Sequence, residues 1–232
     1  MTPFQQKQLT LMRQMETRLS FNANAATIVP LQTNYATDTQ LCLSANCFLS
    51  NDIANTIQTK IIEPLQRLDP TQYYYANASL HITLHSIRVI HDPPSYTQSD
   101  IERSKQLLAR LVPAENAFPV VLHGVLSMPT SVAVIVLITP EYDQFIRNLR
   151  QEFIKTGIPD DKKYFTDEIV FANTTICRYV HKPSSEFLQK LKILRNRNMG
   201  NFMINDVSLV ETNAGCHPSK TRIFDTYKFR QN

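Results

Sequence analysis

Hydrophobic and polar positions along the chain fall into short segments that alternate between helical and strand periodicity. The opening segment has the form of a capping box, with Thr2 before Pro3 and Gln5 three positions after the threonine. Apolar residues then recur at every fourth position, at Leu11, Met15 and Leu19. This pattern predicts an amphipathic helix. We expect residues 1–35 to form a helical extension that packs on the main domain, because the stretch after the helix has no clear period.

Strand and helix patterns interleave over the rest of the chain. Strands are predicted at 40–49, 72–76, 79–90, 118–127, 131–138 and 168–180, and a closing hairpin is predicted at 201–211 and 221–230. Helices are predicted at 51–68, 98–112, 141–156 and 184–196. This order indicates an α/β or α+β protein with mixed strand pairing. We expect residues 36–232 to form one domain.

Two of the predicted strands carry similar small polar groups in apolar surroundings. The segments LHITL at 80–84 and ANTTI at 172–176 lie 92 residues apart, because 173 − 81 = 92. A helix and then a pair of strands are predicted after each segment. The sequence therefore indicates two related halves with pseudo-twofold symmetry.

The polar groups of these strands share faces, because side chains at i and i+2 of a strand point the same way. His81 and Thr83 therefore project together, and Asn173, Thr175 and Cys177 do the same in the second half. If the strands are symmetry neighbours, their polar faces line one cleft.

A phosphodiester suits such a cleft. Its displacement needs one proton removed and another delivered, while hydroxyl groups hold the non-bridging oxygens. Histidine fills both proton roles near neutral pH. The alternative that His81 is a hydrogen-bonded structural residue stays open on this pattern alone.

A second histidine follows His81 at a spacing that can chelate metals on a helix. On a strand, His81 and His85 would lie about 13 Å apart. We therefore expect no metal site here. By the same parity His85 lies on the His81 face, where it could contact a substrate in the cleft or have a plain rim or packing role.

Composition narrows the function further. The four glycines lie at least 15 positions apart, which excludes glycine-rich dinucleotide and P-loop motifs. The formal charge of +4 permits an RNA partner without indicating a dedicated duplex binder.

The longest apolar run has seven residues, so we expect no membrane partner. Four cysteines without a CxxC pair and a start without a secretory pattern predict free thiols and a cytoplasmic location.

The segment ASLHITLHSI resembles the first HxT motif of the 2H phosphoesterase superfamily, which includes LigT-type 2'-5' RNA ligases and 2',3'-cyclic phosphodiesterases. The segment FANTTICRYV stands where the second motif belongs. The stretch FMINDVSLVETNAGCHPSKTRIFDTYKF is similar to the closing strands of that family. The resemblance covers residues 38–230, roughly.

The resemblance implies a bilobal, pseudo-symmetric fold in which two mixed or antiparallel sheets flank a central cleft, with helices outside. It implies that His81 is one of two acid/base histidines and that Thr83 and Thr175 bind phosphate. No metal or organic cofactor is implied. The chain departs from the motif at Asn173, whose amide can bind a phosphate oxygen but cannot exchange a proton at neutral pH. We therefore expect impaired catalysis.

The partner implied by the resemblance is RNA or a small nucleotide with a 2',3'-cyclic phosphate or a 2'-5' phosphodiester. The alternative is a module that binds the phosphate without catalysis. Other histidines that could replace the missing one are His123, His181 and His217.

Further candidates for substrate contact carry open alternatives. In the run of tyrosines at 73–75, one ring such as Tyr75 could stack on a base or pack in the core. By strand parity Arg178 is on the opposite face from Thr175, where it could contact a ligand or form a salt bridge. A basic cluster could meet RNA phosphates or be a solvated helix face, and it comprises Lys182, Lys190, Lys192, Arg195 and Arg197.

Overall fold

The fold is described from a computed structural model, which defines residues 1–22 and 26–231. Positions 23–25 of the expected N-terminal extension lie outside the described residues. The helices are α1 (Pro3–Phe21), α2 (Asn51–Ile57), α3 (Glu63–Gln66), α4 (Gln98–Leu111), α5 (Pro140–Lys155) and α6 (Ser185–Leu194). A π-helical turn, Gln58–Ile62, joins α2 to α3. The strands are β1 (Leu41–Phe48), β2 (Tyr73–Tyr74), β3 (His81–His91), β4 (Phe118–Met128), β5 (Ser131–Leu137), β6 (Ala172–Arg178), β7 (Asn198–Ile204), β8 (Asp206–Thr212) and β9 (Arg222–Lys228).

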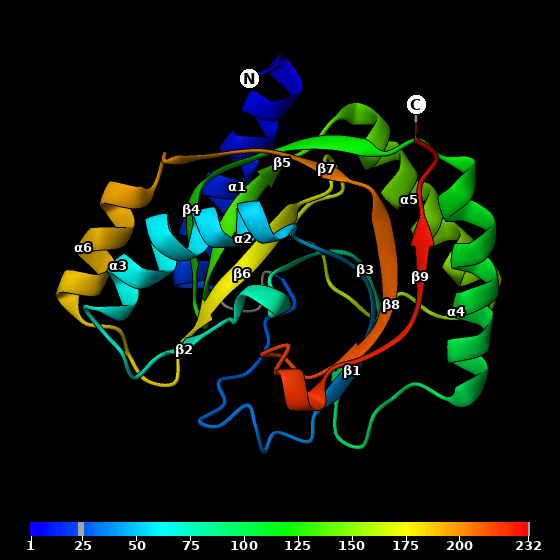
Figure 1. Cartoon of the computed structure of the whole chain (residues 1–232), viewed down its shortest axis with the longest axis horizontal. Helices are drawn as coiled ribbons and strands as arrows, with labels where there is room; N and C mark the ends of the chain where they lie inside the picture. Colours follow the sequence, from blue (N-terminus) through cyan, green and yellow to red (C-terminus); the bar gives the residue numbers. More distant parts are fainter. Residues whose placement is uncertain (23–25, 232) are drawn as a thin grey trace.

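The strands form two sheets with every pair of named strands antiparallel. The four-stranded sheet has the order β3-β1-β8-β9, and the five-stranded sheet has the order β2-β6-β5-β4-β7. Helices α2, α3 and α6 lie on one side of the molecule and α4 and α5 lie on the other (Figure 1). This confirms the expected α+β class, with antiparallel pairing in place of mixed pairing.

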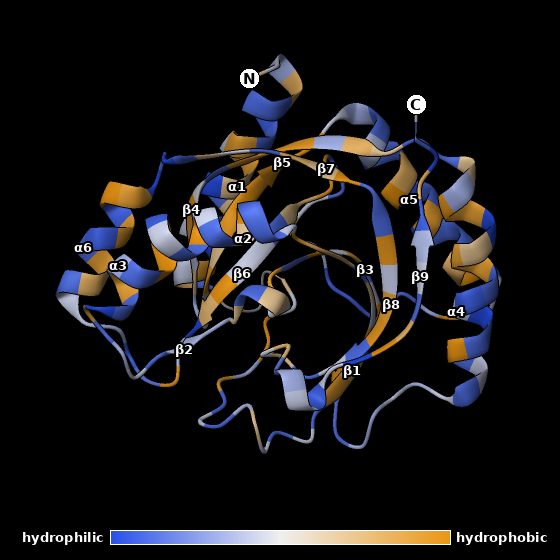
Figure 2. Cartoon of the chain, viewed as in Figure 1, coloured by the Kyte–Doolittle hydropathy of each residue, from blue (hydrophilic) through white to orange (hydrophobic). Residues whose placement is uncertain are grey.

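The fully buried strand β5 runs through the middle of the five-stranded sheet. All seven of its residues are buried, and it is among the most hydrophobic segments in Figure 2. The helices around the sheets show both hydrophobic and hydrophilic residues, since one face of each meets the core and the other meets solvent. Burial therefore follows the predicted periodicity for these elements.

Helix α1 covers the outer face of the five-stranded sheet. The predicted capping box is confirmed, because the Gln5 backbone N–H donates to the Thr2 hydroxyl at 3.2 Å and the Thr2 backbone N–H donates to Gln5 Oε1 at 3.1 Å. A separate apolar cluster joins the helix to β4 and β5, and it is formed by Met12, Met15, Leu19, Leu126, Ile135 and Leu137.

The prediction of one strand at 201–211 is wrong. The chain leaves β7 at Asn205 and enters β8, which belongs to the other sheet. Ile204 and Val207 are both fully buried although they lie three positions apart, which breaks the period of two. The closing hairpin is therefore formed by β8 and β9 alone, while β7 pairs with β4.

Candidate functional site

Strand β3 carries a β-bulge directly after its threonine. Thr83 pairs with Asn46 of β1 and His85 pairs with Ala45, so the pair Leu84 and His85 stands opposite one residue. A bulge of this kind shifts the alternation of side chains along the rest of the strand. His85 consequently packs on the core side, 3% exposed, with its ring 4.8 Å from that of Phe153 on α5. The expectation that His85 shares the His81 face is wrong.

Strand β6 carries the same irregularity at the equivalent place. Thr175 pairs with Ala133 and Cys177 pairs with Val132, so Ile176 is the extra residue. Ile176 and Cys177 both lie fully buried in the main core. The expected common face of Thr175 and Cys177 is therefore wrong. The shared position of the two bulges supports the view that the halves of the chain are related.

The bulge also changes the position of Arg178. By strict alternation it would point away from Thr175, but the extra residue brings both side chains to one cavity. The Arg178 Nε–H donates to the Tyr75 hydroxyl at 3.0 Å and to the Ala214 carbonyl. Burial has the largest single effect and lowers the pKa of Arg178, but the contact with Tyr75 together with nearby Tyr35 and Cys42 raises it overall, so the guanidinium stays charged.

One cavity of about 320 Å³ lies between the two sheets, where β3 and β6 pack against each other. Its lining brings together six residues that the sequence singled out, namely Tyr75, His81, Thr83, Asn173, Thr175 and Arg178. The two polar segments, 92 positions apart in the chain, thus face a common space. We refer to this space as the central cleft.

His81 stands at this cleft with one ring nitrogen already engaged. Its Nδ1–H donates to the Ser79 carbonyl at 2.7 Å, which leaves Nε2 as the nitrogen that can exchange a proton with a ligand. The rings of Phe48 and Tyr75 lie 5.8 and 6.4 Å from the imidazole. This contact holds the ring in one orientation.

Cys216 modifies the proton affinity of His81. Burial lowers the pKa of His81, but the nearby Cys216 sulfur and the Ser79 carbonyl together raise it above its ordinary value. Burial has the largest single effect and raises the pKa of Cys216, but His81 together with the hydroxyls of Thr221 and Thr212 lowers it overall. Cys216 has a positive φ of 44° and its carbonyl accepts from the Ser79 hydroxyl at 2.7 Å. Sequence reasoning missed this neighbour, because it lies 135 positions from His81 and no motif marks it.

Lys162 is a second cleft residue that sequence reasoning missed. It comes from the segment between α5 and β6, and its Nζ donates to the Ser86 hydroxyl at 3.5 Å. Burial and the nearby charge of Arg150 lower the pKa of Lys162. Its neighbours in the chain, DDKKY, show neither strand nor helix periodicity, so nothing in the sequence directs this lysine to the cleft.

The other candidate histidines lie elsewhere. His181 hydrogen-bonds Thr71 at 2.7 Å, and His217 hydrogen-bonds Ser219 at 2.8 Å, while His123 lies on β4 at the edge facing β7. The lining of the central cleft includes none of the three. They are therefore poor replacements for a histidine at position 173.

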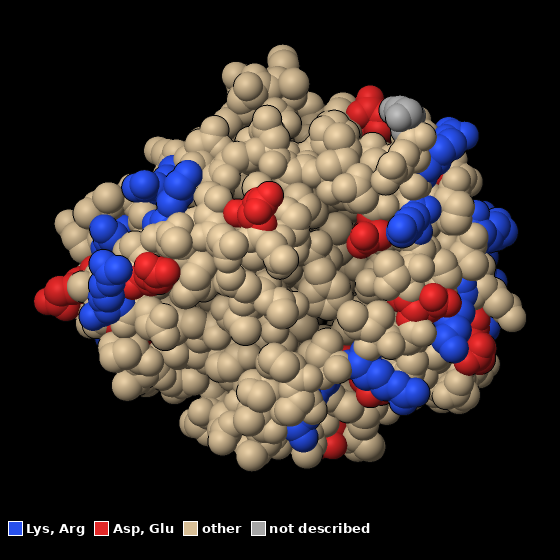
Figure 3. All heavy atoms as spheres, in the orientation of Figure 1, with Lys and Arg blue, Asp and Glu red and all other residues tan. Residues whose placement is uncertain are grey.

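Of the tyrosines at 73–75 and the basic cluster, only one residue lines the central cleft. Of the three tyrosines, Tyr75 lines the cleft, while the hydroxyls of Tyr73 and Tyr74 donate to the carbonyls of Gly215 and Asp69. The basic cluster lies just before, on and just after α6, and none of its five residues lines the cleft. On the face shown in Figure 3, basic and acidic side chains are interspersed towards the two ends and the centre has few charges.

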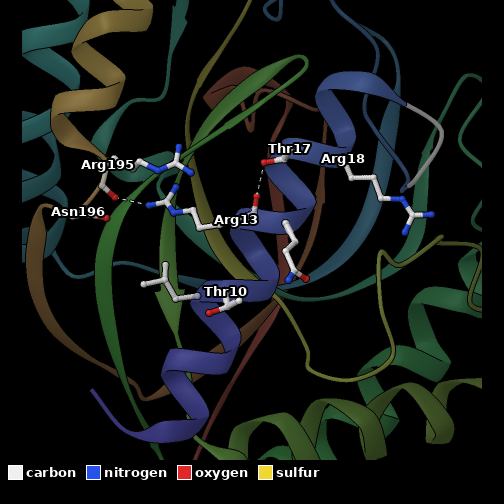
Figure 4. A pocket seen from close by; sticks show the side chains of 8 residues that line it. Thr10, Arg13, Thr17, Arg18, Arg195 and Asn196 are labelled. Carbon is white, nitrogen blue, oxygen red and sulfur yellow. Dashed lines mark hydrogen bonds between the residues drawn. The ribbon is translucent and has the colours of Figure 1, made fainter.

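An open groove of about 680 Å³ runs along α1, away from the central cleft (Figure 4). Its arginines are largely satisfied within the protein. Arg13 donates to the carbonyls of Val125 and Arg195, and Arg195 forms an ion pair of 2.8 Å with Glu16. These contacts attach α1 to the rest of the protein. They explain the charged residues Arg13 and Arg195 in this groove, so no bound ligand is needed to explain them.

Within residues 1–22 and 26–231, no group of histidine, cysteine or acidic side chains could hold a metal ion. All four cysteines are free thiols. No helix in the described part of the chain is both long enough and apolar enough to cross a bilayer.

Comparison with solved structures shows which fold this is. TT0787 of Thermus thermophilus superposes with a TM-score of 0.59 at 14% identity, over 81% of this chain and 97% of that one. A crystal structure described as a phosphoesterase superposes with a TM-score of 0.55 at 15% identity, over 84% of this chain and 100% of that one. E. coli LigT complexed with NADP+ superposes with a TM-score of 0.53 at 12% identity, over 82% of this chain and 98% of that one. No family model and no curated protein sequence matches this chain. The chain therefore has the fold of LigT and phosphoesterase structures, which was expected from its motifs.

Proposed function

We propose that this protein is a 2H-type phosphoesterase-like protein that binds, and slowly turns over, the 2',3'-cyclic phosphate or 2'-5' phosphodiester of RNA or a small nucleotide. The observation that carries the proposal is the common cavity lined by His81, Thr83, Asn173 and Thr175. Structures of E. coli LigT hold 3'-AMP, ATP and phosphate, which supports a nucleotide ligand for this cleft.

His81 is the residue we assign to proton transfer. Its Nδ1–H is held by the Ser79 carbonyl, so Nε2 would take the proton from the attacking water as the new P–O bond forms. Only the neutral form of the ring can take this proton, and the raised pKa of His81 reduces the share of that form near neutral pH. The leaving ribose oxygen, which departs from the far side of phosphorus in an in-line displacement, would take its proton from solvent water.

Hydroxyl and guanidinium donors would hold the phosphate during this exchange. Thr83 and Thr175 line the cleft from two different strands, β3 and β6. Both hydrogen bonds of Arg178 use its Nε–H. The two terminal NH₂ groups of Arg178 would therefore be free to bind phosphate oxygens, where a charged donor binds more strongly than a neutral one. Asn173 would donate its amide to a further oxygen.

Asn173 is also the reason for slow turnover. An amide cannot supply the second proton transfer, and a positioned acid or base typically contributes about 10²- to 10⁴-fold in rate. The second candidate function, a binding module without catalysis, is favoured by this same residue. Both candidates use the same phosphate donors.

The test is hydrolysis of adenosine 2',3'-cyclic phosphate by three proteins: wild type, His81→Ala and Asn173→His. We expect measurable turnover for wild type and loss of at least about 100-fold for His81→Ala. We expect Asn173→His to raise the rate by one or more orders of magnitude, because it supplies the missing proton donor. His91→Ala is the matched control, since His91 lies exposed at the far end of the same strand.

Equal rates for wild type and His81→Ala would refute a catalytic role for His81. No turnover by any of the proteins, combined with tight binding of the nucleotide that depends on Thr83 and Thr175, would favour the binding module.

A further inference from the structure

A second cavity, of about 120 Å³, adjoins the central cleft. Thr83 and Asn173 line both cavities, so the two spaces meet at the candidate reaction centre. The second cavity extends from there along β3 towards α5. Its volume is well above the roughly 10–15 Å³ that one water molecule requires. We refer to it as the side cavity.

Positive charge gathers on the side cavity. Arg150 of α5 and Lys162 both line it, and both stand over the ring of Tyr164, with Arg150 Cζ at 3.8 Å and Lys162 Nζ at 5.7 Å from the ring centre. The residues described as lining the cavity include no aspartate or glutamate. The nearby Asp160 accepts a hydrogen bond from the Tyr164 hydroxyl at 3.2 Å. The cavity therefore attracts anions.

Two buried polar atoms at this cavity lack partners in the described structure. They are Nε of Arg150 and Nδ1 of His85, a residue that is 3% exposed. A buried donor or acceptor without a partner costs about 1–3 kcal/mol, so native structures rarely leave one unexplained. Burial, together with the charges of Arg150 and Lys162, lowers the pKa of His85 to about 3, so its ring is neutral at physiological pH. A neutral imidazole N–H and a guanidinium N–H are both suitable donors to a phosphate oxygen.

We propose that the side cavity is an anion subsite that holds a second phosphate group of the ligand whose phosphodiester lies at His81. The ligand class is then a nucleotide or short oligonucleotide with two phosphoryl groups. Arg150 and Lys162 supply the charge, and His85 supplies a neutral donor. This inference rests on the proposed function only in its choice of ligand for the central cleft.

The test compares the affinity of three ligands by isothermal titration calorimetry. They are adenosine 2',3'-cyclic phosphate, the same nucleotide with an added 5'-phosphate, and the dinucleotide ApA ending in a 2',3'-cyclic phosphate. We expect wild type to bind at least one of the two-phosphate ligands tenfold or more tightly than the single-phosphate ligand. The two-phosphate ligand that binds more tightly shows whether the second phosphate is a 5'-phosphate or the internucleotide phosphate of an oligonucleotide.

Arg150→Gln removes one cation from the side cavity, and we expect the preference ratio to fall below threefold. Lys162→Gln provides a second variant from a loop, in case Arg150→Gln does not fold. The matched control is Arg110→Gln, which removes the same charge from the surface of α4, where Arg110 pairs with Glu152 at 2.6 Å. We expect this control to keep the full preference. A wild type without preference, or a preference retained in both side-cavity variants, would overturn the subsite.

A direct readout is independent of turnover. Titration with inorganic pyrophosphate should shift the ¹⁵N resonances of the His85 ring in wild type and in His81→Ala, and should leave them unshifted in Arg150→Gln. If no ligand is hydrolysed while the preference depends on Arg150, the subsite stands and catalysis fails. If hydrolysis depends on His81 but no preference exists, catalysis stands and the subsite fails.

Discussion

Two histidines that lie four positions apart on one strand have pKa values shifted in opposite directions. His81 faces the cleft, and its contacts with Cys216 and Ser79 raise its pKa above the ordinary value despite burial. His85 faces the side cavity and Phe153 of α5, where burial and two nearby cations lower its pKa to about 3. The bulge at Leu84 separates these environments, because it turns His85 away from the face that His81 occupies. Only the first ring can exchange protons near neutral pH.

His85 makes a measurable contribution to acid sensitivity. The unfolded histidine takes a proton as the pH falls below about 6.5, whereas the folded one does not until about 3, so the free energy of unfolding decreases over this window. Between pH 7 and 5 we expect His85 to account for a loss of about 2 kcal/mol. Urea unfolding of wild type and His85→Gln at both pH values measures this difference.

The expected outcome is a smaller loss of stability in His85→Gln than in wild type on going from pH 7 to 5. His91→Gln is the control, since His91 is exposed and its replacement should leave the wild-type slope. Equal slopes for wild type and His85→Gln would show that His85 is protonated in the folded state.

At the scale of elements, hydrophobic periodicity predicts the existence and type of the long helices and strands. It does not reveal single-residue irregularities. The bulges at Leu84 and Ile176 place Arg178 in the cleft and remove His85 and Cys177 from it, against strict alternation. The change of sheet at Asn205 is equally hidden, because β7 and β8 are separated by this one residue and no turn signal marks the break.

Helix α1 is joined to the sheet by a buried amide as well as by apolar contacts. Gln8 Nε2 donates to the Val136 carbonyl at 3.1 Å, and Gln8 Oε1 accepts from the Ile138 N–H at 3.0 Å. We expect Gln8→Ala to lower the free energy of unfolding by about 1–3 kcal/mol, because it leaves those backbone groups buried without partners. Denaturant unfolding measures this loss.

Gln6→Ala is the control for this change, since Gln6 is exposed on the same helix. A loss no greater for Gln8→Ala than for Gln6→Ala would mean that the buried amide contributes nothing to the attachment of α1.

At the scale of the whole molecule, the two sheets enclose the cleft and α1 closes the outer face of one of them. The helix covers apolar side chains of β4 and β5, including Leu126, Ile135 and Leu137, each fully buried. It therefore completes a hydrophobic cluster with β4 and β5. This packing gives α1 a structural role.

Removal of residues 1–22 tests that role. We expect the truncated protein to bind a hydrophobic dye such as ANS and to lose its cooperative thermal transition, because the cluster on β4 and β5 becomes exposed. Circular dichroism and dye fluorescence of both proteins provide the measurement. A truncated protein that unfolds cooperatively at the wild-type temperature would show that α1 is dispensable for the fold.

Local periodicity and residue type were sufficient to predict the class of fold and the two polar strands with their separation of 92 positions. Which polar groups meet depends instead on how distant segments pack together. Cys216, Lys162 and Arg178 reach the site through a distant loop, an aperiodic segment and a bulge. The environment of each group then depends on neighbours far away in the chain, and it is this environment that makes one histidine titratable and keeps the other neutral.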